Sequence, residues 1–204
     1  MMTENIELLE KYFTKGSLAH HIIMQHSKSV AELALKIAKK NPHLDVNLSL
    51  LEQGAMLHDI GIIKTNAPDL DCNGEYPYIC HGWLGREILE AEGFPEIAPF
   101  CERHTGTGIS LDEIIRYNLP LPHREMMPVT TEEMIVCYAD KFFSKSGKNL
   151  TQPKKLKKIY ASLHRYGEDK LRRFDEFIGM FGIYYINGWH DDSPKSTYGE
   201  RLIG

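Results

Sequence analysis

The sequence has 204 residues, of which 42% are hydrophobic and 25% charged, as expected for one globular domain with a substantial core. Its formal net charge of -4 provides no overall attraction to nucleic acid or to an anionic membrane, so neither is expected as the main partner. No apolar run is long enough to cross a bilayer. The four cysteines form no CxxC pair, and the first residues lack an apolar signal core. We therefore expect a cytoplasmic protein.

Helical periodicity dominates the chain and predicts an all-α fold without internal repeats or a convincing strand pattern. Helices are predicted over residues 3–13, 17–40, 47–59, 81–93, 95–104, 110–118, 130–145, 154–167 and 168–182. Thr3 is the expected N-cap of the first helix, and a Thr-x-x-Glu capping pattern opens the helix at 130. Residues 61–80 are rich in Gly, Pro, Asn and Asp, which indicates a long loop, and loops of this length are usually functional.

One polar pair stands out in the otherwise apolar stretch AMLHDIGIIK, where His58 is followed by Asp59. Burying an ionised carboxylate without a partner is costly, and a bound cation would explain it. His26 and Asp140 also interrupt apolar runs. Taken singly, His26 fits a structural histidine, and Asp140 fits a surface carboxylate paired with Lys141 or Lys145.

Taken together and in chain order, these residues resemble the HD-domain superfamily of metal-dependent phosphohydrolases. HSKSVAELALKIA resembles the family's first-histidine helix, GAMLHDIG its central motif and VCYADKF its final aspartate segment. The resemblance covers residues 17–145. It implies an HD-domain helical bundle within a single domain over 1–204, extended by further helices at about 150–190.

The resemblance also implies a metal centre. One divalent cation would be held by His26, His58, Asp59 and Asp140, and some members bind a second cation through two further histidines. His81 and His104 lie in the expected interval, so Asp59, His81 and His104 are the predicted second set. His104 alone would also suit the negative end of its helix. The expected cofactors are two divalent ions, of iron, manganese or a similar metal.

For such a centre the resemblance implies hydrolysis of a phosphate ester or anhydride by a metal-activated water, with Asp59 bridging the two ions. Lys64 is predicted to assist catalysis by offering an ammonium group to the substrate phosphate, although a solvated loop lysine is an equal interpretation. Arg103 and Lys141 are further candidates for phosphate contacts. The expected substrate is a small nucleotide or a related phosphorylated metabolite.

Several alternatives remain open at this stage. TGTGIS follows His104, instead of the Gly-Tyr-Pro segment of the cyclic-dinucleotide phosphodiesterases, and the His81 and His104 pair disfavours the mononuclear nucleotidases. The spacing is similar to that of diadenosine-polyphosphate hydrolases. A diiron oxygenase uses the same ligands, and a noncatalytic nucleotide-sensing module is a third candidate. Aromatic residues over 182–190 favour packing on the body of the protein or in a homodimer.

Overall fold

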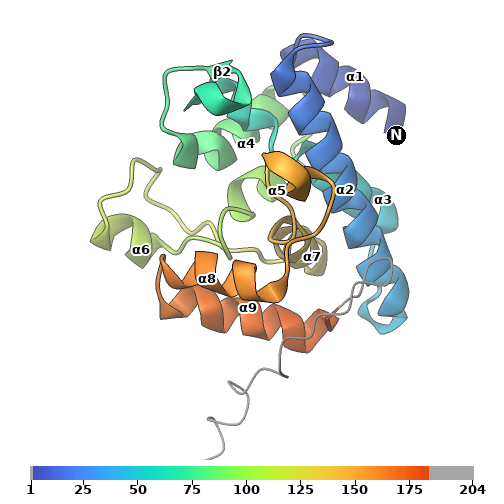
Figure 1. Cartoon of the computed structure of the whole chain (residues 1–204), viewed down its shortest axis with the longest axis vertical. Coiled ribbons are helices and arrows are strands. Elements are labelled where there is room, and N and C mark those ends of the chain that lie inside the picture. Colours follow the sequence, from blue (N-terminus) through green and yellow to red (C-terminus); the bar gives the residue numbers. More distant parts are fainter. Residues whose placement is uncertain (1, 184–204) are drawn as a thin grey trace, which may run out of the picture.

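The computed structural model describes residues 2–183, apart from the side chains at positions 2, 147 and 148, and is built almost entirely from helices (Figure 1). The α-helices are α1 (Met2–Tyr12), α2 (Leu18–Lys40), α3 (Leu48–Leu57), α4 (His81–Ala91), α5 (Ala98–Arg103), α6 (Leu111–Arg116), α7 (Thr131–Asp140), α8 (Leu156–His164) and α9 (Glu168–Phe181). The predicted all-α fold is confirmed. Among the described residues, no helix combines the length and apolarity needed to span a membrane.

The long loop after α3 is ordered by short elements. It contains the 3-10 turns η2 (Ile60–Lys64), η3 (Pro68–Leu70) and η4 (Tyr78–Cys80), and two antiparallel strands, β1 (Asn66–Ala67) and β2 (Cys72–Asn73). The expectation of no strands is therefore wrong at this one place. Two residues per strand are too few for alternation to be visible in a sequence.

The helix ends are fixed by the expected side-chain types, with two corrections. Thr130 and Glu133 form the predicted capping box of α7. Thr3 is not an N-cap, because α1 already includes Met2. The helix predicted over 130–145 ends at Asp140, because the next backbone N–H groups bond to carbonyls only three residues back, as in a 3-10 turn. This early end decides where the residues after Asp140 lie.

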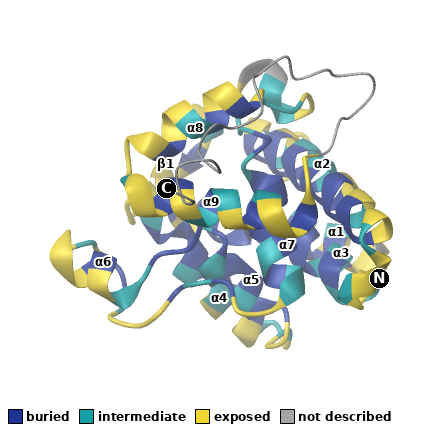
Figure 2. Ribbon diagram, turned by 90° about the horizontal axis from the view of Figure 1, so that it is seen from below, coloured by how far each residue is buried: buried dark blue, intermediate teal, exposed yellow. Residues whose placement is uncertain are grey.

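The core runs through the centre of the bundle, where α7 lies against α2, α3 and α5 (Figures 1 and 2). Tyr138 of α7 is fully buried. Phe174, Phe177 and Phe181 of α9 lie against it, with ring centroids 5.5, 6.3 and 5.7 Å away. The C-terminal helices thus belong to the same apolar cluster as α2 and α3. Residues 184–190 of the predicted aromatic docking segment lie outside the described residues.

A smaller cluster supports α6, which projects from the body beside α8 and α9 in Figure 1. Its buried members are Cys80, Leu84, Ile109, Ile114, Leu121 and Met126. The four cysteines are all buried and free of disulfides, as expected from their spacing.

Candidate metal centre

Four side chains from α2, α7 and the junction between α3 and η2 meet in the bundle. His26 lies midway along α2, His58 caps the C-terminus of α3, Asp59 precedes η2 and Asp140 is the last residue of α7. His26 Nε2 lies 3.1 Å from Asp59 Oδ2 and 3.0 Å from Asp140 Oδ1. His58 Nε2 lies 3.1 Å from the same Asp59 oxygen. One ligand atom from each of the four falls within 4.8 Å of the others, so the four could hold one metal ion together.

A second set shares Asp59 with the first. His81 is the first residue of α4 and His104 follows the last residue of α5, so the two helices present their adjoining ends to the same point. Their Nε2 atoms lie 3.5 and 3.3 Å from Asp59 Oδ1 and 3.1 Å from each other. The two oxygens of Asp59 therefore face different sets of histidines.

Hydrogen bonds behind the rings orient three of the histidines. His58 Nδ1 donates to the carbonyl of Ala55, and His81 Nδ1 donates to that of Tyr78, each over 2.7 Å. His104 Nδ1 donates to the carbonyl of Cys101 over 2.7 Å. A ring that keeps its proton on Nδ1 has a lone pair on Nε2, which is the form that binds a metal. These backbone contacts therefore point three Nε2 atoms at the two oxygens of Asp59.

Gly61 allows α4 and η2 to pack closely against each other. A Cβ atom at Gly61 would lie 2.0 Å from the carbonyl oxygen of His81 and 2.3 Å from the backbone nitrogen of Gly85. Only a residue without a side chain lets η2 lie against this end of α4. Gly61, the last residue of the central motif GAMLHDIG, thus brings His81 within reach of Asp59.

The electrostatics of the pocket suit two anionic carboxylates together with neutral rings at His81 and His104. Burial, aided by His104, lowers the pKa of His81 to about 3, and burial also lowers the pKa of His104. Burial opposes the charge of His58, but Asp59 and Asp140 outweigh it and raise its pKa to about 9. Against burial, their cationic neighbours hold the pKa of both carboxyls well below the usual range. A metal ion would compete with the His58 proton.

The residues present fit divalent cations. His26, His58 and Asp59 are fully buried, and the Nε2 atoms of the two rings make no well-directed hydrogen bond to any described residue. Buried polar atoms are rarely left without a partner, so a ligand at this point is expected. Imidazole nitrogens with carboxylate oxygens suit iron, manganese or zinc. The His/Asp cluster could therefore hold metal ions.

Lys145 is the residue of this centre that sequence reasoning missed, because it was considered only as a partner of Asp140. Its Nζ lies 2.7 Å from Asp59 Oδ2. Burial opposes its charge, but Asp59 raises the pKa of Lys145 above its usual value, with help from Tyr78 and Asp140. The ring of Tyr78 stacks on His81 with centroids 4.8 Å apart. No local pattern indicates Lys145, since its position depends on the turn that follows α7.

The three predicted phosphate contacts are placed differently. Lys141 is adjacent to the centre, since its Nζ lies 2.9 Å from Asp140 Oδ2. Arg103 donates to both carboxylate oxygens of Glu133, over 2.8 and 3.0 Å. Lys64 ends η2 and its side chain is exposed. Substrate contacts by Arg103 and Lys64 stay predictions, and Lys141 has the most suitable position of the three.

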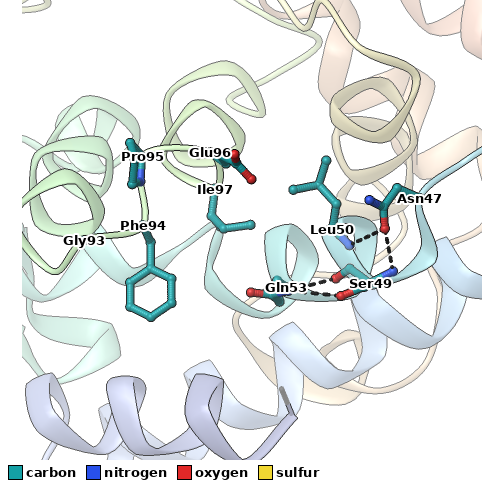
Figure 3. Close-up of a pocket in the computed structure, with 9 residues that line it drawn as sticks. All are labelled: Asn47, Ser49, Leu50, Gln53, Gly93, Phe94, Pro95, Glu96 and Ile97. Atoms are coloured by element: carbon teal, nitrogen blue, oxygen red, sulfur yellow. Dashed lines mark hydrogen bonds between the residues drawn. The ribbon is translucent and has the colours of Figure 1, made fainter.

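The cavity drawn in Figure 3 is separate from the His/Asp cluster. This groove of about 400 Å³ lies between the start of α3 and the turn before α5. It is lined by Asn47, Ser49, Leu50, Gln53, Gly93, Phe94, Pro95, Glu96 and Ile97. None of the six clustered His and Asp residues lines it, and the side chain of Asn47 accepts two backbone N–H groups at the helix start. We therefore assign the groove no role in the centre.

The helical bundle and the two adjoining His/Asp sets define the class: an all-α protein with a buried candidate metal centre. The family model of the HD domain matches residues 23–144, which is more than half of the chain. The chain belongs to the HD-domain family, as the three motifs predicted.

The chain is similar in sequence to three proteins that it matches over 61–68% of its length. It is 36% identical over 140 residues to a tRNA (cytidine(56)-2'-O)-methyltransferase of Thermoplasma volcanium, covering 68% of this chain and 35% of that protein. The corresponding enzyme of Picrophilus torridus is 34% identical over 131 residues, 64% of this chain and 34% of its own length. An uncharacterized protein of Methanocaldococcus jannaschii is 38% identical over 127 residues, 61% of this chain and 68% of its own.

The chain thus spans about a third of the length of the two methyltransferases. Their names state what the whole proteins do, and the aligned third is the part that they share with this chain. No solved structure matches the chain significantly.

Proposed function

We propose that this protein is a metal-dependent phosphohydrolase that cleaves a phosphate ester or anhydride of a small nucleotide or related metabolite. The observation that carries the proposal is the arrangement around Asp59. Its Oδ2 faces His26 and His58, while its Oδ1 faces His81 and His104. One carboxylate between two sets of histidines is suited to bridging two divalent cations.

When bound, such a cation pair lowers the pKa of a water molecule and polarises a phosphoryl group, so that the water can attack. In this proposal Asp59 holds both sets together, and His26, His58 and Asp140 complete the first set. His81 and His104 complete the second, kept in the metal-binding tautomer by their backbone contacts. In the same proposal Lys141, whose Nζ lies 2.9 Å from Asp140 Oδ2, binds a phosphate oxygen.

Two observations require that other activities be measured as well. The same six side chains would serve a diiron oxygenase, so oxygen uptake has to be measured if the purified protein contains iron. Two relatives act on tRNA according to their names, so RNA with a terminal phosphate belongs in the substrate screen beside nucleotides. The buried His/Asp cluster favours hydrolysis over methyl transfer for this chain.

The first experiment measures metal content by elemental analysis in protein purified without added metal, together with release of phosphate from nucleotides. We expect about two metal ions per chain in the wild type, loss of both in Asp59→Ala, and about one in His104→Ala. Phosphate release should fall with the metal in each variant. The control is His43→Ala, because His43 is exposed and belongs to neither set of candidate ligands.

Retention of phosphate release by Asp59→Ala would exclude this centre as the catalyst. Full metal content without any turnover would favour the nucleotide-sensing module, and oxygen uptake by an iron form would favour the oxygenase. A single metal ion that is unaffected by His104→Ala would remove the second set from the proposal.

A further inference from the structure

Resting on the proposed phosphohydrolase function, we infer that Lys145 and Lys154, together with Lys141, form a binding site for a chain of two or more linked phosphates. The preferred substrate would then be a diphosphate or longer polyphosphate rather than a monoester. Neither Lys145 nor Lys154 is among the residues that the family motifs point to.

The backbone brings the three lysines together. After α7 ends, the N–H of Ser144 donates to the carbonyl of Asn149, and the N–H of Lys154 donates to the carbonyl of Phe142 over 2.6 Å. The segment 141–154 therefore doubles back, so that Lys154 lies beside the turn that carries Lys141 and Lys145. The early end of α7 permits this fold-back, which brings three lysines that are separated in the sequence into one group. We call Lys141, Lys145 and Lys154 the lysine wall.

Two side chains of this wall contact the metal centre. Lys141 Nζ lies 2.9 Å from Asp140 Oδ2, and Lys145 Nζ lies 2.7 Å from Asp59 Oδ2. Lys154 is partly buried nearby, where burial lowers its pKa to about 8, Asp140 opposes that lowering, and the charges of Lys141 and Lys145 add to it. Two ammonium groups thus contact the two carboxylates, and the charge of Lys154 interacts with the same residues.

The charge balance indicates the kind of ligand. With divalent cations bound, Asp59 and Asp140 are already compensated, and the three lysines then need a negative partner of their own. A single phosphate held by the cations offers little further charge to them. A second phosphate linked to it extends away from the cations and supplies oxygens for Lys145 and Lys154.

Two buried charged clusters elsewhere in the described part of the chain are neutralised internally. Glu113 is paired with Lys170 and Arg173, and Glu102 with Arg86 and Arg124. The lysine wall differs because its carboxylate partners are the proposed metal ligands themselves. It is therefore the cluster whose charge most clearly calls for a ligand from outside the chain.

The test compares two probes that differ by one phosphate: AMP and the α,β-methylene analogue of ADP, whose diphosphate linkage cannot be hydrolysed. Binding to the full protein is measured by calorimetry with Mn²⁺ in excess over the nucleotide. We expect the analogue to bind about tenfold tighter than AMP. Lys154→Gln should weaken binding of the analogue about tenfold and that of AMP by less than about threefold, because only the second phosphate loses a charged contact.

Lys36→Gln is the matched control, since it removes an exposed lysine of α2 and should leave both affinities unchanged. Thermal melting and metal content of Lys154→Gln should match the wild type, which separates lost binding from lost folding. Lys145→Gln, checked for metal content in the same way, should repeat the selective loss.

Equal binding of AMP and the analogue by the wild type would overturn the inference, as would an equal loss of both affinities in Lys154→Gln. If the proposed function itself is wrong, the result is different: the protein releases no phosphate from ATP, ADP or AMP. The binding preference is measured without turnover, so the two failures are distinguishable.

Discussion

At the scale of single residues, Asp59 and Gly61 together explain why two helix ends meet at one carboxylate. Asp59 is fully buried between the two sets of histidines. Two residues later, Gly61 removes the side chain that would otherwise hold α4 away. One short motif thus contains both a candidate metal ligand, Asp59, and the residue that allows close packing, Gly61. The two can be substituted separately.

Gly61→Ala should destabilise the protein and weaken the second set of ligands. The added methyl group would meet backbone atoms of His81 and Gly85, which cannot rotate away. We expect a loss of about 1–3 kcal/mol in unfolding free energy, as for other overpacked sites. We also expect a fall in metal content towards one ion per chain, because α4 carries His81. Urea unfolding and elemental analysis measure the two effects.

Gly179→Ala is the matched control for that substitution. A Cβ atom at Gly179, on α9, would meet no atom within 4 Å, and alanine favours a helix by about 1 kcal/mol over glycine. Unchanged or slightly raised stability is expected there. If both variants behaved alike, close packing at Gly61 would not explain why glycine occupies that position.

At the scale of elements, a buried ion-pair cluster joins α6 to α9. Glu113 of α6 accepts from Lys170 at 2.7 Å and from Arg173 at 3.0 Å. Lys170 Nζ also donates to the carbonyl of Gly108 over 2.6 Å. Because α6 projects from the body, this cluster is a main link between it and the C-terminal helices (Figure 1).

The cluster predicts a pH dependence of stability. Burial opposes the charge of Glu113, but its hydrogen bonds, chiefly to Lys170, lower its pKa to about 2, from 4.5. A lowered pKa means that the stabilisation is complete above about pH 4.5 and is lost as the pH falls towards 2. We expect Glu113→Gln to be about 2 kcal/mol less stable than wild type at pH 6, with the difference vanishing near pH 2.

Chemical denaturation of both proteins across this pH range measures the difference. Acid effects at the metal centre occur in both proteins and cancel in the comparison. A difference that stayed constant with pH would show that the charge of Glu113 does not stabilise the link.

At the scale of the whole molecule, the C-terminal helices share the core that positions Asp140. Phe174 is fully buried and lies against both Tyr138 of α7 and Tyr160 of α8, with ring centroids 5.5 Å away in each case. Asp140 lies two residues after Tyr138 on the same helix. We therefore propose that α8 and α9 fold as one unit with the motif-bearing helices, in a single domain.

Phe174→Ala tests this proposal. Truncating a buried aromatic ring costs about 3–5 kcal/mol, and in one cooperative domain that loss lowers the single unfolding transition as a whole. Circular dichroism in the far and near ultraviolet should give one coincident transition at a lower midpoint. Met180→Ala on the exposed side of α9 should shift it by less than about 0.5 kcal/mol. Two separate transitions, with metal binding retained through the first, would contradict a single domain.

The sequence by itself determined the helical class and the family, because helical periodicity and the His, His-Asp, Asp motifs are patterns of neighbouring residues. It also named the six His and Asp residues that the structure brings together, although their roles as ligands stay predictions. It misplaced the end of α7 and missed the short strands, where a few backbone bonds outweigh periodicity.

Only the tertiary structure decided which groups surround those six. It paired Arg103 with Glu133, left Lys64 exposed, and brought Lys145 to Asp59 and Lys154 beside the turn after α7. The physical reason is that periodicity reports which face of a helix is apolar. The position of a charged side chain beyond a helix end depends instead on turns and contacts between residues far apart in the chain, which no local pattern encodes.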